Sequence, residues 1–265
     1  MAAVSDRGLR HRRNEDAFAV SAVALPHGAP AVVAVVCDGV SSAHRPADAS
    51  AAAAESADAS LLEALRRGAP FEDAMRDALL SAGRAVTGLA TEEPGRNPDH
   101  DSPACTCVGA VVSGQGVTVG RVGDSRAYWI PDDHETPASC LTEDDSWAAG
   151  MISAGLVPEE EAYADSRAHA ITAWLGADSP ELAPHTASFE LDGPGVVVVC
   201  TDGLWNYAES AGELASAVEA DAGTHPLRCA QALVRVALDG GGHDNVTVAV
   251  LPVPAPAGRT EHEPS

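Results

Sequence analysis

The chain has 265 residues, of which 45% are hydrophobic, and this is long enough to bury a large core. Its formal net charge is -23 at pH 7, and all 16 basic residues are arginine. This charge argues against non-specific binding to nucleic acid or to an anionic membrane surface. The partners that we expect are therefore cations or locally basic surfaces.

The amino-terminal sequence does not resemble a secretion signal, because it becomes charged at Asp6 and Arg7 before any apolar segment forms. No stretch of about 18 apolar residues, the length that spans a membrane, occurs in the sequence. We therefore expect a cytoplasmic protein with no membrane partner. In that compartment the six cysteines are expected to be reduced thiols rather than disulfides.

Short valine-rich runs bounded by glycine, aspartate or proline predict the strands. In chain order these runs are residues 17–24, 31–37, 107–113, 116–122, 126–130, 186–191, 195–200 and 246–251. Helices are predicted at residues 46–68 and 71–90, which form a hairpin broken by Gly68 and Pro70, and at residues 209–220 and 226–239.

The order of these elements is not the regular βαβ alternation of a parallel sheet, and antiparallel sheets with helices packed outside fit it better. We expect a single domain over residues 1–253, since no polar linker divides the apolar runs. Within it, residues 142–182 form a partly helical insert, and residues 91–104 form a mobile loop. Residues 254–265, rich in proline and charge, are expected to be a disordered tail.

Four aspartates stand at the ends of predicted strands. Asp38 follows the run AVVAVVC and Asp202 follows VVVVCT, and each precedes a glycine that permits a tight turn. Asp124 follows a third strand, and Asp244 comes just before the last one. A single Asp-Gly pair is an ordinary turn signal. Four aspartates in this position together indicate that strand ends deliver carboxylates to one site.

Glu15 and Asp16 add two further acids just before the first predicted strand. If these chain segments converge, each pair of carboxylates about 4 Å apart repels by roughly 4 kcal/mol at an effective dielectric constant near 20. Such a cluster requires cations. Ligation by oxygen alone selects hard ions such as Mg²⁺ or Mn²⁺ rather than zinc, which prefers cysteine and histidine.

Seven motifs, five of which contain these acids, occur in the order typical of one protein family. They are DRGL…RNEDAF (6–18), VCDGVSS (36–42), VGDSRAY (122–128), LTEDDS (141–146), ITAWLG (171–176), CTDGLW (200–205) and GGHDNVTV (241–248). Together they resemble the type 2C family of metal-dependent protein-serine/threonine phosphatases, in its bacterial form. The resemblance implies an α+β fold, a four-layer α-β-β-α sandwich of two antiparallel β-sheets flanked by paired helices.

The resemblance also implies a metal centre of two Mg²⁺ or Mn²⁺ ions, with the possibility of a third. Asp38 would bridge two ions, with the backbone carbonyl of Gly39 on one of them, and Asp202 and Asp244 would complete the shell of the second. Asp38, Asp202 and Asp244 are therefore the candidate catalytic residues.

Three further acids have implied roles around these two ions. Glu15 would hold metal-bound water, Asp16 would support the site from behind, and Asp124 would contribute to the third, weaker metal position. The insert at residues 142–182 corresponds to the flap of the family.

The phosphate-binding residue departs from the pattern of the family. Related bacterial members have an arginine four residues before the acid that corresponds to Glu15, and this chain has His11 there. Arg10, Arg12 and Arg13 surround it, and any of them offers the bidentate contacts that histidine lacks. We take Arg13, Arg10 and His11 as the candidate phosphate-binding residues.

The resemblance implies an enzyme that hydrolyses phosphoserine and phosphothreonine with a metal-activated water, since paired metal ions lower the pKa of bound water. The expected partners are phosphorylated proteins, namely Ser/Thr kinases and their substrates, and the chain is expected to be a monomer. The alternative is a catalytically weak pseudophosphatase that binds phosphoproteins or regulates a kinase. It is favoured by altered motif residues, among them His11, Ser41 and Asp145.

Overall fold

Two antiparallel five-stranded sheets form the centre of the protein in the computed structural model, which describes residues 1–91, 102–133, 135–179 and 182–256. We call them sheet A and sheet B. Sheet A has the strand order β1 (Ala2–Asp6), β12 (Val246–Val253), β11 (Gly195–Cys200), β7 (Arg126–Pro131) and β8 (Ser139–Cys140).

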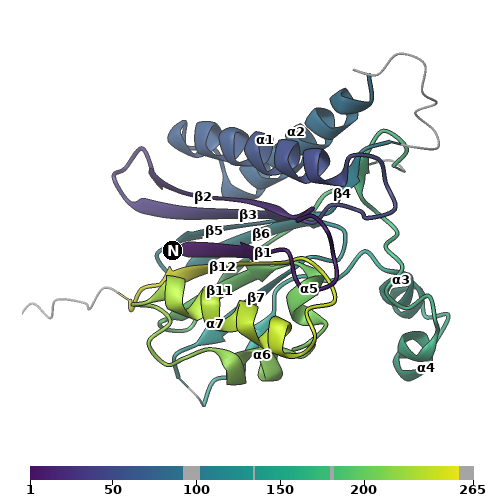
Figure 1. Cartoon of the computed structure of the whole chain (residues 1–265). Coiled ribbons are helices and arrows are strands. Elements are labelled where there is room, and N and C mark those ends of the chain that lie inside the picture. Colours follow the sequence, from purple (N-terminus) through teal and green to yellow (C-terminus); the bar gives the residue numbers. More distant parts are fainter. Residues whose placement is uncertain (92–101, 134, 180–181, 257–265) are drawn as a thin grey trace, which may run out of the picture.

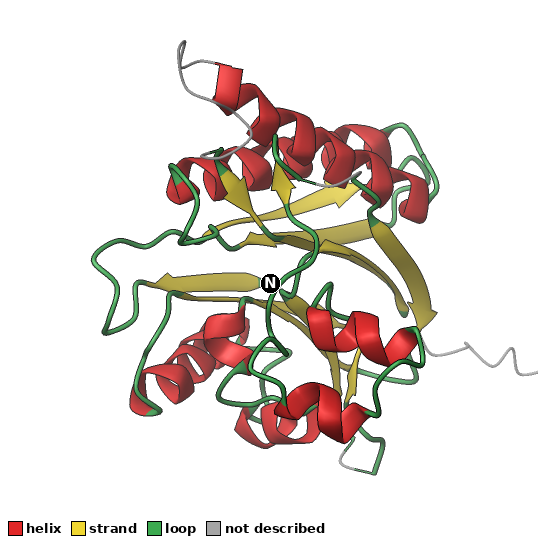
Figure 2. Cartoon of the chain, turned by 90° about the vertical axis from the view of Figure 1, so that its right-hand side faces the viewer, coloured by secondary structure: helices red, strands yellow, loops and turns green. Residues whose placement is uncertain are grey.

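Sheet B lies face to face with sheet A, as Figure 2 shows. Its strand order is β10 (His185–Glu190), β6 (Gly116–Val122), β5 (Cys107–Ser113), β3 (Pro30–Cys37) and β2 (Ala17–Ala24). A separate pair of two-residue strands, β4 (Ala104–Cys105) and β9 (Leu175–Gly176), lies beside it. The pairing is antiparallel throughout, as the order of elements predicts.

Helices cover the outer face of each sheet and complete four layers (Figures 1 and 2). The long helices α1 (Pro46–Arg66) and α2 (Phe71–Thr91) lie on sheet B. The short helix α5 (Asp202–Trp205), α6 (Ala211–Ala217) and α7 (Pro226–Asp239) lie on sheet A. The predicted α+β sandwich with helices outside both sheets is confirmed.

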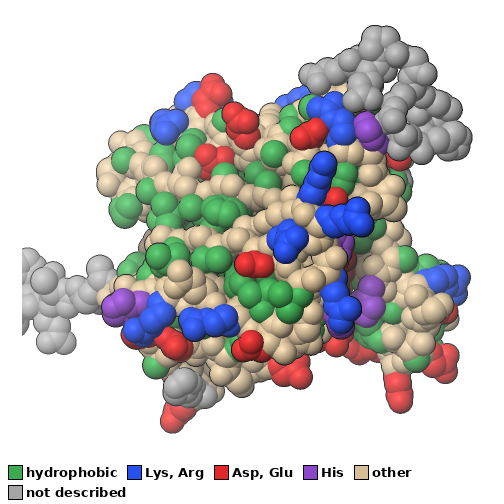
Figure 3. Space-filling view, in the orientation of Figure 1, with side chains coloured by type: hydrophobic (Ala, Val, Ile, Leu, Met, Phe, Trp, Pro, Cys, Tyr) green, Lys and Arg blue, Asp and Glu red, His purple; other side chains and the backbone are tan. Residues whose placement is uncertain are grey.

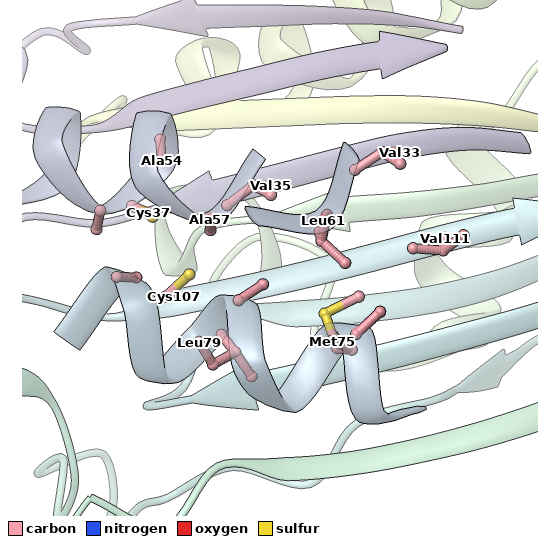
Figure 4. Packing of buried hydrophobic residues seen from close by; sticks show 14 of the residues in the cluster. Val33, Val35, Cys37, Ala54, Ala57, Leu61, Met75, Leu79, Cys107 and Val111 are labelled. Carbon is pink, nitrogen blue, oxygen red and sulfur yellow. The ribbon is translucent and has the colours of Figure 1, made fainter. Parts of the chain in front are cut away.

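Three layers of buried apolar side chains hold the sandwich together. One layer lies between the two sheets and contains alternate residues of their strands, such as Val108 and Val199. The second lies between sheet B and α1 and α2, where Figure 4 shows Leu61 and Leu79 of the helices in the same cluster as Val35 and Val111 of the sheet. The third lies between sheet A and α7. Strands β3 and β11 are buried on both faces, which explains their unbroken valine runs.

Strand β1 is the main element that the sequence does not predict. Its sequence, AAVSD, has one valine and no apolar alternation, so its strand propensity is low. The neighbouring strand β12 imposes the extended conformation, with Val4 paired to Val248. Tertiary pairing therefore overrides local preference at this edge of sheet A.

The insert at residues 142–182 contains α3 (Trp147–Ser153) and α4 (Glu159–Ala164), which project from the sandwich at the lower right of Figure 1. They pack on each other through Ala148, Ala162 and Ala168. The predicted loop at residues 91–104 and the predicted tail lie partly outside the described residues, which omit 92–101 and 257–265. Among the helices described, none is long and apolar enough to cross a membrane.

We expect replacement of Leu61 by alanine to lower the free energy of unfolding by about 2–5 kcal/mol, because Leu61 is fully buried between α1 and sheet B. Leu227→Ala is the matched control, since this leucine is 51% exposed, and its change should stay within about 0.5 kcal/mol. Urea unfolding of both variants measures the difference. Equal effects of the two substitutions would contradict the position of this core layer.

Candidate active site

Strand ends of both sheets bring five aspartates to one end of the sandwich. Asp38 follows β3, Asp202 begins α5 directly after β11, and Asp124 lies in the turn between β6 and β7. Asp16 precedes β2, and Asp244 precedes β12. The ends of β3 and β6 belong to sheet B and that of β11 to sheet A, so both sheets contribute to the site.

The charges of these aspartates act on one another. Burial raises the pKa of Asp38 well above its ordinary value, and the nearby charges of Asp16, Asp202 and Asp124 raise it further. Burial also raises the pKa of Asp202, and the charge of Asp244 adds to the effect. The carboxyl group of Asp38 lies near enough to those of Asp202 and Asp16 to offset part of the rise in the pKa of each. The cluster therefore retains protons that isolated aspartates would lose near pH 4.

Asp16 lies at the back of the cluster between the two sheets. Its Oδ2 accepts hydrogen bonds from Thr247 Oγ1 at 2.7 Å and from Thr201 Oγ1 at 3.1 Å. Burial nevertheless raises the pKa of Asp16 to about 7, more than these two hydrogen bonds lower it, and the charge of Asp202 contributes. Burial also raises the pKa of Asp124 to about 7, with the charges of Asp202 and Asp144 adding to the shift.

Two carboxylate oxygens of the cluster are buried without a hydrogen-bond partner, namely Asp16 Oδ1 and Asp202 Oδ1. Such orphaned oxygens are costly unless a cation or a proton satisfies them. The oxygen-only donor set fits a hard divalent cation. Within the described part of the chain, no three His, Cys, Asp or Glu side chains are already arranged to hold a metal ion. Because the raised pKa values keep protons on the cluster, a cation would have to displace protons and draw the carboxylates together.

Asn245 is buried beside Asp244 and links three segments of the site. Its Nδ2 donates hydrogen bonds to the carbonyl oxygens of Arg7 and Arg13, at 2.8 and 3.0 Å. Its Oδ1 accepts a hydrogen bond from the backbone N–H of Glu15 at 2.6 Å. This one carboxamide therefore fixes the segment before Asp16 against the start of β12.

Close backbone approach explains the glycine after Asp202. A Cβ atom built on Gly203 would lie 1.8 Å from the carbonyl oxygen of Asn245, a distance at which the backbone itself must move. Gly39, after Asp38, is equally enclosed, because its Cβ would lie 2.6 Å from the carbonyl oxygen of Glu15. Both glycines therefore allow neighbouring chain segments to place their acids side by side.

Glu15 and His11 border the cluster. The Glu15 carboxylate accepts a hydrogen bond from Ser41 Oγ at 3.0 Å, and its backbone oxygen accepts one from the Gly39 N–H at 3.2 Å. His11 Nε2 lies 3.2 Å from Asp244 Oδ1. The candidate phosphate-binding residues therefore differ in their contacts. His11 contacts Asp244, while Arg10 and Arg13 are exposed and form no ion pair with a described residue.

Comparison with known proteins identifies the family of this site. Residues 7–224 match the family model described as "Protein phosphatase 2C". The chain belongs to the protein phosphatase 2C family. The matched region contains every acid of the cluster except Asp244, which lies beyond its end.

Relatives and solved structures agree with this family. The serine/threonine protein phosphatase PstP of Mycobacterium tuberculosis is 28% identical over 257 residues, which are 95% of this chain and 44% of PstP. The chain thus spans less than half the length of this curated relative. A bacterial serine phosphatase has a similar fold, with a TM-score of 0.73, 23% identity and coverage of 97% of this chain and 98% of that one.

The catalytic domain of PstP solved in complex with two manganese ions also has this fold. Its TM-score is 0.63 at 24% identity, and the match covers 95% of this chain and 97% of that one. These structural matches confirm the sandwich architecture predicted from the seven motifs.

The sequence did not reveal the residues that hold the acids in place. Thr201, which follows the valine run of β11, and Thr247, which interrupts the valines of β12, both bind Asp16, and a threonine at each of these strand ends is the one signal that could have found them. Arg126 likewise holds Asp144 through two hydrogen bonds, of 2.9 and 2.7 Å, and its guanidinium carbon lies 3.8 Å from the ring centre of Trp205. This arginine ties the start of the 142–182 insert to α5.

The raised pKa values predict how pH affects the stability of the metal-free protein. For Asp16 and Asp124 the folded-state pKa of about 7 exceeds the unfolded value of about 4, so the folded state binds more protons between these pH values. The contribution of these two groups to stability is therefore fully present below pH 4 and is lost as the pH rises through 7, by an amount on the order of a few kcal/mol.

Thermal unfolding in the presence of a chelator should accordingly show a lower Tm at pH 8 than at pH 5.5. Saturating Mn²⁺ should raise the Tm more at pH 8, where fewer protons compete for the carboxylates. The variant Asp16→Asn should weaken the pH dependence. A metal-free Tm that rises between pH 5.5 and pH 8 would contradict the raised pKa values.

Proposed function

We propose that this protein is a metal-dependent phosphatase that removes phosphate from phosphoserine and phosphothreonine in proteins. The observation that carries the proposal is the group of five aspartates whose charges act on one another at the end of the sandwich. Membership of the protein phosphatase 2C family supports it. Phosphorylated proteins are then the substrates, and Ser/Thr kinases and the targets of those kinases are the partners that we propose.

Two hard divalent cations, Mg²⁺ or Mn²⁺, are proposed to bind the cluster, as the two manganese ions of the PstP structure suggest. Asp38 would bridge them, with the Gly39 carbonyl on one ion and Asp202 and Asp244 on the other. The partnerless Oδ1 of Asp202 supports this assignment. Such cations supply a water of lowered pKa and neutralise charge on the phosphoryl oxygens.

The remaining acids are proposed to support this centre. Glu15 is positioned by its backbone hydrogen bonds to Gly39 and Asn245 and would hold water at the edge of the site. Asp16, fixed by two threonines, would orient the bridging Asp38 from behind, and Asp124 would serve a third, weaker cation position. His11, Arg10 and Arg13 are proposed to bind the phosphate, since they lie on the segment that Asn245 holds beside Asp244.

We also propose that residues 1–253 work as one phosphatase domain. The layer of side chains between the sheets supports this, because it joins strands from both halves of the chain. Residues 142–182 would form its flap, anchored by the pair of Arg126 and Asp144.

We expect Asp38→Asn to reduce kcat/KM for a phosphothreonine peptide with Mn²⁺ by roughly 100-fold or more, because a neutral amide cannot bridge two cations. Asp77→Asn, which changes an exposed acid of α2, is the matched control and should retain wild-type turnover. The chelated Asp38→Asn protein should be at least as stable as wild type, since the substitution removes one of the acids that repel one another. Wild-type protein that binds Mn²⁺ but hydrolyses neither the peptide nor para-nitrophenyl phosphate would instead indicate the pseudophosphatase.

A further inference from the structure

The segment between β1 and β2 concentrates positive charge in an acidic protein. Residues 7–13, which we call the arginine loop, contain four of the 16 arginines: Arg7, Arg10, Arg12 and Arg13. All four side chains are exposed. Figure 3 shows arginine side chains gathered on the right half of this face, over the loop that follows β1 and beside the amino-terminal end of α1.

The backbone of the arginine loop is fixed beside the aspartate cluster. The Asn245 side chain donates hydrogen bonds to the carbonyls of Arg7 and Arg13, and so holds both ends of the loop. Between them, the Leu9 N–H donates to the Gly242 carbonyl at 2.7 Å. Gly8 adopts φ 72°, and a Cβ there would lie 2.0 Å from the carbonyl oxygen of Asp244. The loop is therefore pressed against the site while its arginines project outward.

The arginines of this loop are not neutralised by neighbouring acids. No residue in the described ranges forms an ion pair with any of the four, whereas some surface arginines elsewhere pair with nearby carboxylates, as Arg67 does with Glu63 and Arg228 with Glu219. Within the loop, His11 is the residue that contacts a site acid. The guanidinium groups are thus available to a ligand that approaches the cluster.

Local charge decides which peptides can approach this site. Salt screens charges beyond about 8–10 Å, so the distant acids that make up the net charge of -23 contribute little at the loop. The near field combines the aspartate cluster, which cations would neutralise, with four exposed arginines on the loop whose backbone is fixed beside Asp244. Guanidinium groups bind carboxylates in bidentate geometry.

We infer that the arginine loop selects substrates that carry aspartate or glutamate next to the phosphorylated residue. This inference rests on the proposed phosphatase function and names its substrate class, an acidic phosphopeptide segment. Four arginines exceed what one phosphate group can occupy, since one bidentate guanidinium clamps a phosphate. The remaining arginines of the loop can then form ion pairs with the carboxylates that flank the phosphorylated residue.

The test compares two phosphothreonine peptides that differ only in their flanking residues, glutamate in one and glutamine in the other, with saturating Mn²⁺. Wild-type protein should favour the acidic peptide by about tenfold in kcat/KM, mainly through a lower KM, because two or three exposed ion pairs supply an effect of this size. The preference should shrink between 50 and 500 mM NaCl, concentrations chosen to screen such pairs strongly.

The double variant Arg7→Gln with Arg12→Gln should reduce the preference to about twofold or less. Arg67→Gln, at the opposite end of α1, is the matched control and should keep the wild-type preference, since α1 is 21 residues long. Equal kcat/KM for both peptides in wild type, or an unchanged preference in the double variant, would overturn the inference while leaving the phosphatase function intact. No turnover of either peptide or of para-nitrophenyl phosphate would overturn both.

Discussion

Repulsion among carboxylates is the constraint on which this structure depends. Five aspartates from separate chain segments meet at one end of the sandwich, where burial and the charges of neighbouring aspartates raise the pKa of Asp16, Asp38, Asp124 and Asp202. Such a group is stable only with bound protons or bound cations. The raised pKa of Asp38 keeps protons on the cluster in the metal-free protein, and the carboxylate oxygens become available to cations when those protons leave. The repulsion among these carboxylates thus affects both the stability of the metal-free protein and the binding of the cations that we propose for activity.

The rest of the fold holds the aspartates rigidly in place against their mutual repulsion. Valine-rich strands, buried on both faces, fix the positions where β3 and β11 end. Gly39 and Gly203 let those ends approach other backbone segments, and Asn245 joins the arginine loop to the start of β12. A carboxylate cluster on mobile loops would separate to relieve its repulsion, whereas strand ends embedded in three packed layers cannot.

The sequence predicts most of this arrangement, because its strongest signals are local. A run of valines followed by Asp-Gly marks both a buried strand and the acid at its end, so Asp38 and Asp202 can be placed without a structure. Helices α1 and α7 are similarly visible from their apolar pattern and from the glycines that follow them. The seven motifs in order then indicate the family. The match of residues 7–224 to the protein phosphatase 2C family model confirms this prediction.

What the sequence could not supply are the contacts between distant segments. Strand β1 has weak propensity and exists because it pairs with β12, at the other end of the chain. Thr247 and Asn245 act on residues more than 200 positions away, and no local pattern identifies such partners. The arginine loop is conspicuous in the sequence, but only the structure shows that its ends are fixed beside Asp244 while its side chains face outward.

The most direct test of the proposed cation site is a crystal structure of the protein soaked with Mn²⁺ at pH 8, where few protons compete for the carboxylates. The proposal predicts two anomalous-scattering peaks, on the order of 4 Å apart, that share Asp38 as a ligand. One of them should also contact Asp202 and Asp244. Full occupancy by Mn²⁺ at a place away from Asp38 would contradict it.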